Sequence, residues 1–326
     1  MQGHWPRQTH AKLSGMLVDT RCVCRTGLII AWVLMVCLRF AVEGQSLQTP
    51  PAGWQSAVRS AARSAPEARI LVLEIATGRL LASSHLAEAA RTLATPGSAF
   101  KPLVLYGLVS NGRWDPALRI ACSRKLSIGG HSVNCSHPPA APMDAREALS
   151  WSCNTYFATV AGTLVPGELR RLLDSTGLLS STGLAINETT AAFRDLRTPD
   201  ETRLALLGVE GVKVTPLEMA TAYRWLALQF DSHPNSAATK TLRAALEDSA
   251  SVGTARAVAQ GGVPVAGKTG TASSGTGGGQ SHGWFIGLAP SDAPIAVIAV
   301  YLPAGHGSDA AHVAAELLAR SPLRHR

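Results

Sequence analysis

Apolar and polar residues alternate in two parts of the chain, one near each end, and this pattern predicts β-strands. Residues 68–85 alternate and then turn at a Thr-Gly pair, which is typical of a β-hairpin. Three more strands are expected at 264–272, 282–290 and 294–302. Strands from both ends can pair with one another, so we expect a single antiparallel sheet of five strands.

The middle of the chain has the periodicity of helices instead. The first helix is expected to end at Asn111-Gly112, and the second is interrupted by the polar residues 152–154. Strands at both ends with helices between them predict an α+β fold, in which helices flank the sheet and an all-helical lobe is inserted at about 115–260. The expected helices are 98–110, 143–165, 167–179, 215–230, 241–260 (one helix or a pair) and about 309–320.

Charge and length restrict the function classes only slightly. The 326 residues suffice for one large domain or two modest ones. The formal net charge is +8, but the lysines and arginines are scattered, without the basic stripe of a nucleic-acid-binding surface. We therefore expect no nucleic-acid partner.

The N-terminal segment has the features of an export signal. Arg21 and Arg25 precede the apolar run 27–38, which is short for a membrane span but suits a signal peptide. Residues 1–44 are therefore expected to be a leader cleaved after Gly44, or alternatively an uncleaved membrane anchor that extends to Val42. Residues 45–326 would then be exported to the periplasm or another extracytoplasmic compartment.

The cysteines outside the leader agree with export, because an oxidising compartment permits disulfides. Cys122 and Cys135 flank a predicted hairpin with a Gly-Gly turn, which makes them the candidate disulfide. Cys153 is then left over as a small buried residue. His131 and His137 could complete a zinc site with these cysteines, but the spacing does not match a compact metal site, so no metal is expected.

One stretch matches a nucleotide-binding pattern. Residues 262–269 fit the phosphate-loop pattern G-x-x-x-x-G-K-[ST]. The variable positions contain Pro264 and two β-branched residues, and a Gly/Ser loop and another strand follow instead of a helix. A phosphate loop also needs a parallel sheet, so the match is interpreted as accidental.

Two short motifs with catalytic potential lie near helix ends. Ser98 and Lys101 are one turn apart on one helical face, where a lysine with a lowered pKa can take the proton of a serine nucleophile. Ser152 and Asn154 form an S-x-N motif where the helical pattern breaks. There they could relay a proton and bind a substrate amide, although a helix-capping cluster would look the same.

A third motif, Lys268-Thr269-Gly270-Thr271, lies on a predicted edge strand. Lys268 can supply positive charge for a substrate carboxylate, and Gly270 leaves room for close approach. In this order the motifs S-x-x-K, S-x-N and K-T-G resemble those of the penicillin-recognising serine enzymes. The resemblance covers about 68–320. It includes PGSAFKPL, ALSWSCNTYF, VKVTPLEMATAY and VAGKTGTA, which are similar to transpeptidase domains of penicillin-binding proteins.

The resemblance implies residue roles. Ser98 would be the acylated nucleophile and Lys101 its base, while Ser152 moves protons and Asn154 positions substrate. The other implied roles are carboxylate binding or support of Ser152 by Lys268 and Thr269, and an oxyanion hole formed by the N–H groups of Ser98 and Thr271.

The implied substrate is a peptidoglycan stem peptide ending in D-Ala-D-Ala, with β-lactams as inhibitors, cell-wall synthesis proteins as partners and no cofactor. Two alternatives stay open: a class D-like β-lactamase, whose Tyr-Gly-Asn motif is missing here, and a non-catalytic penicillin-binding sensor or scaffold. Glu188 and Glu210 are the candidates for a deacylating glutamate.

Overall fold

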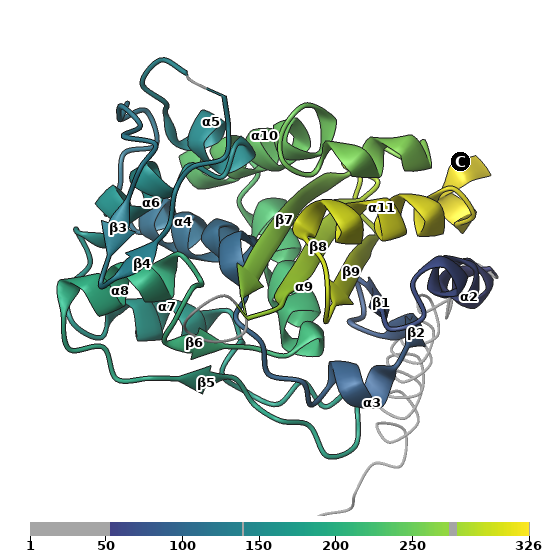
Figure 1. Ribbon diagram of the computed structural model, residues 1–326. Helices are drawn as coiled ribbons and strands as arrows, with labels where there is room; N and C mark the ends of the chain where they lie inside the picture. The colour runs from purple at the N-terminus through teal and green to yellow at the C-terminus, as the bar shows by residue number, and fades with distance from the viewer. Residues whose placement is uncertain (1–52, 139, 274–278, 326) are drawn as a thin grey trace, which may run out of the picture. The chain divides into compact units, whose positions relative to one another are not determined.

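A computed structural model describes residues 53–138, 140–273 and 279–325 (Figure 1). The predicted leader, residues 1–44, lies outside the described residues. The described residues belong to a compact unit that begins at Pro51. Within these ranges, the structure contains no helix of the length and apolar character that a membrane crossing requires.

A five-stranded antiparallel sheet forms the centre of the molecule, in the order β2-β1-β9-β8-β7 (Figure 1). This arrangement confirms the predicted α+β fold, because the N-terminal hairpin pairs with the C-terminal strands through β1 and β9. β7 forms one edge, as predicted for the strand with the K-T-G motif. The strands are β1 (Arg69–Glu74), β2 (Leu80–Ser84), β7 (Ala266–Ser273), β8 (Ser281–Ala289) and β9 (Ala296–Leu302).

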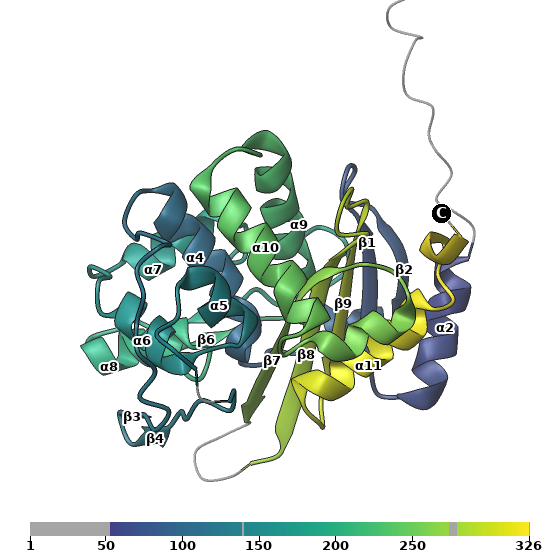
Figure 2. The same ribbon diagram turned by 90° about the horizontal axis from the view of Figure 1, so that it is seen from above.

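Both faces of the sheet are covered by helices (Figure 2). Successive side chains of a strand point to opposite faces, so Ile70 and Val72 pack with α2 (Trp54–Ser64) and α11 (Gly307–Leu318). Leu71 and Leu73 point the other way, into the core shared with the helical lobe. The sheet is therefore buried on both sides, which explains why its central strands are nearly continuous apolar runs.

The helical lobe follows the predicted pattern with two refinements. The expected helix 143–165 is split at the S-x-N motif, and the segment 241–260 forms a helix and a separate 3₁₀ turn, η2. Three helices, α2, α3 and α8, were not predicted; α8 begins with a Thr198–Glu201 capping box. The helices outside the two already given are α3 (Leu86–Ala89), η1 (Gly97–Phe100), α4 (Lys101–Ser110), α5 (Ala145–Ser150), α6 (Asn154–Ala161), α7 (Glu168–Ser175), α8 (Pro199–Leu206), α9 (Pro216–Ser232), α10 (Ala237–Ser251), η2 (Arg256–Gly261) and η3 (Pro322–His325).

Two small two-stranded sheets lie in the helical lobe. The predicted Gly-Gly hairpin is present as β3 (Ser127–Ile128) and β4 (His131–Ser132), and β5 (Ala192–Phe193) pairs with β6 (Val212–Lys213).

The candidate disulfide across the first hairpin is not formed, and this corrects the sequence analysis. Cys122 and Cys135 are free thiols. Backbone hydrogen bonds between the two arms continue to Cys135, whose N–H donates to the Arg124 carbonyl at 2.9 Å, so Cys135 is paired with Arg124 and not with Cys122. Cys135 packs instead against the S-x-N turn, with its Sγ 3.9 Å from that of Cys153.

Candidate active site

Ser98 lies in the short 3₁₀ helix η1, directly before helix α4. It is half-buried, and the turn around it is fixed by the buried Tyr223, whose hydroxyl donates to the Ala99 carbonyl at 2.7 Å. Gly97, with φ of 52°, comes so close to strand β7 that a Cβ there would lie 2.6 Å from the Thr271 carbonyl oxygen. The nucleophile candidate is thus held rigidly beside the K-T-G strand.

Lys101 begins α4 and is completely buried. Its Nζ donates to the Ser152 carbonyl at 3.1 Å and to Asn154 Oδ1 at 2.6 Å. Burial lowers the pKa of Lys101 to about 8, although the nearby Cys153 and Cys135 thiols act in the opposite direction. The structure therefore joins the S-x-x-K and S-x-N motifs through a lysine that readily loses its proton.

The S-x-N motif forms a strained turn between α5 and α6. Ser152 has a φ of 60°, a left-handed conformation that is unfavourable for residues other than glycine. Its Oγ is buried without a hydrogen-bond partner in the described part of the chain. Asn154 is anchored from the other side, since its Nδ2 donates to the carbonyls of Val133 and Asn134 at 3.0 and 3.2 Å. An unpaired hydroxyl in a strained turn is typical of a functional site.

Lys268 of β7 is also completely buried. Its Nζ donates to Thr254 Oγ1 at 3.1 Å and to the Thr269 carbonyl at 2.9 Å, while the Thr269 hydroxyl donates to Thr254 at 2.9 Å. Burial, and then the charge of Lys101, hold the pKa of Lys268 well below its ordinary value. Thr254 was missed by the sequence analysis, because its place beside β7 depends on the turn that follows α10.

The K-T-G motif contacts the segment that carries Ser98 at Gly270. A Cβ at this position would lie 2.5 Å from the Pro96 carbonyl oxygen and 2.8 Å from the Ala99 nitrogen. The Thr271 hydroxyl accepts from the Gly307 N–H at 2.9 Å, so its side chain is tied to the start of α11. This leaves the backbone of Thr271 as the part that faces the turn of Ser98.

Gly270→Ala is expected to force η1 and β7 apart. The added methyl group meets backbone atoms that cannot rotate away, so we expect a loss of about 1–3 kcal/mol in the free energy of unfolding. Denaturant unfolding measures this loss, and Gly130→Ala is the control: a Cβ there meets no atom within 4 Å, so its smaller expected cost comes only from a positive φ of 82°, which Gly270 does not have. Equal losses in the two variants would contradict the close contact.

Neither candidate for a deacylating glutamate is free. Glu188 accepts hydrogen bonds from its own loop, including the Ser181 and Thr182 hydroxyls. These bonds outweigh the effect of burial and lower the pKa of Glu188 to about 2, so it is a poor proton acceptor. Glu210 forms ion pairs with His131 at 3.0 Å and Arg194 at 2.8 Å.

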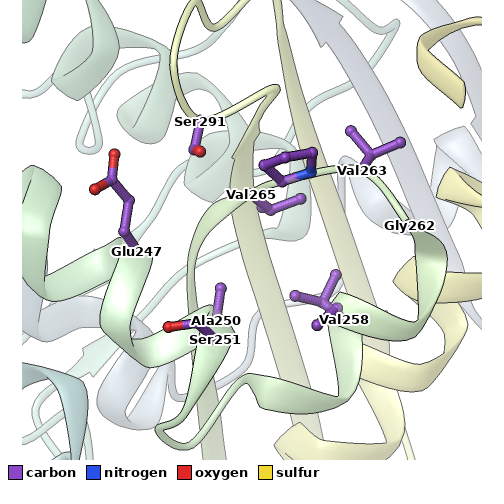
Figure 3. Close-up of a pocket in the computed structure, with 10 residues that line it drawn as sticks. Glu247, Ala250, Ser251, Val258, Gly262, Val263, Val265 and Ser291 are labelled. Atoms are coloured by element: carbon purple, nitrogen blue, oxygen red, sulfur yellow. The ribbon is translucent and has the colours of Figure 1, made fainter.

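Two hollows of the described structure were compared with the positions of the three motifs. The one in Figure 3 has a volume of about 420 Å³ and is lined by 262–265, the start of the phosphate-loop match, together with Val258 and Ala250. It contains no residue of the three motifs, and the segment runs into strand β7 rather than a helix. The other, of about 520 Å³, is lined by Trp151 and Thr254, which adjoin the S-x-N turn and Lys268. This hollow also contains no residue of the three motifs, but it adjoins two of them and is therefore the better candidate for substrate.

Comparisons with known proteins agree with this fold. The family model described as penicillin binding protein transpeptidase domain matches residues 68–321. The fold is similar to the apo transpeptidase domain of Burkholderia pseudomallei penicillin-binding protein 3, with a TM-score of 0.70 and 21% identity, over 84% of this chain and 96% of that one.

Pseudomonas aeruginosa PBP2 in complex with WCK 5153 gives a TM-score of 0.69 and 21% identity, over 81% of this chain and 76% of that one. A peptidoglycan glycosyltransferase from Burkholderia ambifaria gives a TM-score of 0.69 and 20% identity, over 82% of this chain and 92% of that one. A search of curated proteins gave no match. The family model covers most of the chain, and the chain therefore belongs to the penicillin-binding protein transpeptidase domain family.

Proposed function

We propose that this chain is an exported serine acyl-transferase that acts on peptidoglycan stem peptides ending in D-Ala-D-Ala and also binds penicillin. In this proposal it is a D,D-transpeptidase or carboxypeptidase that works through an acyl-enzyme on Ser98. The observation that carries the proposal is the buried Lys101, whose Nζ is held by Ser152 and Asn154 one turn after Ser98. The family membership supports the same chemistry.

The hydrogen bonds of Lys101 suit a general base. A neutral amine has two N–H donors and one lone pair, and both donors are used by the Ser152 carbonyl and Asn154 Oδ1. The lone pair is then available for the Ser98 proton. In the described structure Ser98 is not yet among the hydrogen-bond partners of Lys101, and such contacts commonly tighten only when substrate binds.

We propose that acylation then proceeds in two steps, attack and collapse of the tetrahedral intermediate. Ser98 Oγ attacks the carbonyl carbon of the penultimate D-Ala while its proton passes to Lys101 Nζ. The N–H groups of Ser98 and Thr271 stabilise the oxyanion. When the intermediate collapses, the C–N bond breaks and the departing D-Ala amine takes a proton from Lys101 through the Ser152 hydroxyl. An amine or water next attacks the ester, which gives a cross-link or a shortened peptide and restores Ser98.

Lys268 and Thr269 are proposed to bind the terminal carboxylate of the substrate. Burial disfavours the charged form of Lys268, but a carboxylate in contact with its Nζ favours that form again. Substrates with a free terminal carboxylate would thus bind better than their amides. A class D-like β-lactamase or a sensor without turnover would bind penicillin in the same way, and only the fate of the acyl-enzyme distinguishes them.

The proposed cellular location rests on the family and on the predicted leader. We propose that residues 45–326 function outside the cytoplasm, in the periplasm or an equivalent compartment, as penicillin-binding proteins do. One similar structure comes from a peptidoglycan synthase complex, with a TM-score of 0.64 and 24% identity, and this chain covers 59% of its length. Cell-wall synthesis proteins are therefore the proposed partners.

The rate of acylation is expected to rise with pH through about 8. Below this value Lys101 is protonated and cannot accept the Ser98 proton, so the rate falls about tenfold per pH unit; above it the rate levels off. Burial lowers the pKa that sets this midpoint, and the Cys153 and Cys135 thiols act in the opposite direction. Stopped-flow acylation by penicillin between pH 5.5 and 9.5 measures the profile, and a rate independent of pH would contradict this role.

The product of the reaction tests the proposed function. The exported protein is incubated with a stem-peptide analogue ending in D-Ala-D-Ala, with and without an amino-acid amide as acceptor. Release of one D-Ala per peptide, and transfer to the acceptor when it is present, are the expected results. Hydrolysis of penicillin with many turnovers would identify a β-lactamase instead, and a stable acyl-enzyme without any peptide product would identify a sensor.

A further inference from the structure

The three cysteines of the described structure and one histidine meet behind the S-x-N turn. One ligand atom from each of Cys122, Cys135, Cys153 and His137 lies within 4.8 Å of all the others. Cys122 precedes the β3–β4 hairpin, Cys135 and His137 follow it, and Cys153 is the central residue of the S-x-N motif. Four soft or borderline ligands therefore converge from two segments that are distant in sequence.

The histidine is in the form that binds a metal. His137 is 4% exposed, and its Nδ1 lies 2.7 Å from the Pro138 carbonyl oxygen. A carbonyl can only accept, so Nδ1 carries the proton and Nε2 carries a lone pair. Nε2 is buried and without a hydrogen-bond partner in the described residues. A hydrogen bond from the distal ring nitrogen to a carbonyl is the usual support for a metal-bound imidazole.

The thiols have the surroundings of metal-bound thiolates. The Arg124 N–H donates to Cys122 Sγ at 3.3 Å, and the Asn154 N–H donates to Cys135 Sγ at 3.1 Å. The 3.9 Å between the Cys135 and Cys153 sulfurs is close to the edge of a tetrahedron with zinc–sulfur bonds of about 2.3 Å, which is about 3.8 Å. It is almost twice the length of a disulfide bond.

We propose that Cys122, Cys135, Cys153 and His137 form a structural Cys₃His site for a zinc ion, and that this ion fixes the S-x-N turn. A closed set of four such ligands is typical of structural zinc, because no position is left for substrate. Pairing Cys135 with Cys153 instead would leave the buried His137 Nε2 without a partner among the described residues. Cys122 is half-buried, which provides an entry path for the ion.

The proposed ion would act on catalysis through position. Cys153 lies between Ser152 and Asn154, and Asn154 in turn binds Lys101 Nζ and the segment that carries Cys135. A bond from the metal to Cys153 would hold the strained turn of Ser152 in place. The ligand atoms would all be bound to the metal, so none would react with substrate, although His137 also lines the hollow of about 520 Å³. The four ligands are therefore positioning residues. This part of the inference rests on the proposed function, whereas the metal site itself does not.

Metal content tests the site without any reaction. The full chain is produced in exported form and purified without added metal or chelator, and its zinc is measured by mass spectrometry of the element. About one zinc per chain is expected in the wild type, with loss of zinc in Cys122→Ser and His137→Gln. His131→Gln is the matched control, because His131 lies in the same hairpin segment but pairs with Glu210, and it should keep its zinc.

A second measurement uses the wild type alone, so it tests the site even where the ligand variants do not fold. Removing zinc from the wild type with a chelator should lower the melting temperature by at least about 5 °C, and added Zn²⁺ should restore it. Co²⁺ should replace the zinc and give the visible absorption of a tetrahedral cobalt thiolate. The metal-free protein should acylate with penicillin up to about 10²-fold more slowly and recover with Zn²⁺.

Three results would overturn the proposal. The first is a wild type without zinc whose three thiols all react freely with a thiol reagent, and the second is a chain mass lower by two hydrogens, which means a disulfide. The third is zinc that persists in both ligand variants. If zinc is present but its removal leaves acylation unchanged, the positioning role is wrong while the metal site stands. Zinc without any acylation would instead refute the proposed function alone.

Discussion

Ser98→Ala is expected to abolish covalent labelling by a fluorescent penicillin. The proposed acyl-enzyme forms on the Ser98 hydroxyl, and an alanine offers no atom for the ester bond. Turnover of a D-Ala-D-Ala peptide should fall by about 10⁴-fold to 10⁶-fold, as is typical for the loss of an enzyme nucleophile. Denaturing gels after a time course of labelling, together with peptide kinetics, measure both effects.

The control for this variant lies at the far end of the adjoining helix. Ser110 is exposed, and its hydroxyl donates only to the Gly107 carbonyl within the same turn. Ser110→Ala should label at the rate of the wild type, and both variants should melt at a similar temperature. Undiminished labelling of Ser98→Ala would mean that the nucleophile is another residue.

Lys101→Met is expected to slow acylation by about 10²-fold to 10⁴-fold, the usual contribution of a general base. Methionine fills a similar volume in this completely buried position but cannot accept a proton. The Ser152 carbonyl and Asn154 Oδ1 both lose the hydrogen bond that Lys101 donates. Each buried acceptor left without a donor costs about 1–3 kcal/mol of stability. Stopped-flow acylation measures the rate, and thermal unfolding measures the accompanying loss of stability.

Two observations distinguish loss of the base from general damage. Lys213→Met removes an exposed lysine from β6 and should leave the acylation rate unchanged. In Lys101→Met the remaining acylation should no longer depend on pH around 8, because the group that titrates there is gone. A variant that is folded and acylates as fast as the wild type would contradict the role of Lys101.

The fold could be predicted from the sequence because its strands and helices have clear local signals. The strands of the hairpin 68–85 and the C-terminal strands alternate or form apolar runs bounded by turns, and they pair in the predicted antiparallel sheet. The break at the S-x-N motif was also visible as an interruption of helical periodicity. Helix α2 was missed, although its apolar residues, such as Trp54 and Val58, are spaced to cover one face of the sheet.

The contacts of the candidate site could be predicted only in part. The pairing of Ser98 with Lys101 follows from helical spacing, but the contact of Lys101 with Asn154 joins residues more than 50 positions apart. No local pattern encodes such a contact, and the resemblance implied for Asn154 only a role in positioning substrate. Thr254 had no signal at all, because its role depends on how the turn after α10 meets β7.

The cysteines show the limit of spacing arguments most clearly. Along the chain Cys122 and Cys135 flank a hairpin, so a disulfide was the simplest expectation. Folding brings the S-x-N turn against both residues, and Cys153 then joins them. Because His137 follows the same hairpin, the cluster has four members, and a metal explains all of them where a disulfide explains two.

The most direct test of the proposed acyl-enzyme is to locate the penicillin adduct. The full chain in exported form is incubated with benzylpenicillin, digested, and mapped by mass spectrometry at several times over hours. The account predicts one adduct with the full mass of the drug, on the peptide that contains Ser98, which persists while free drug is removed. No adduct, or an adduct on any other residue, would contradict the account.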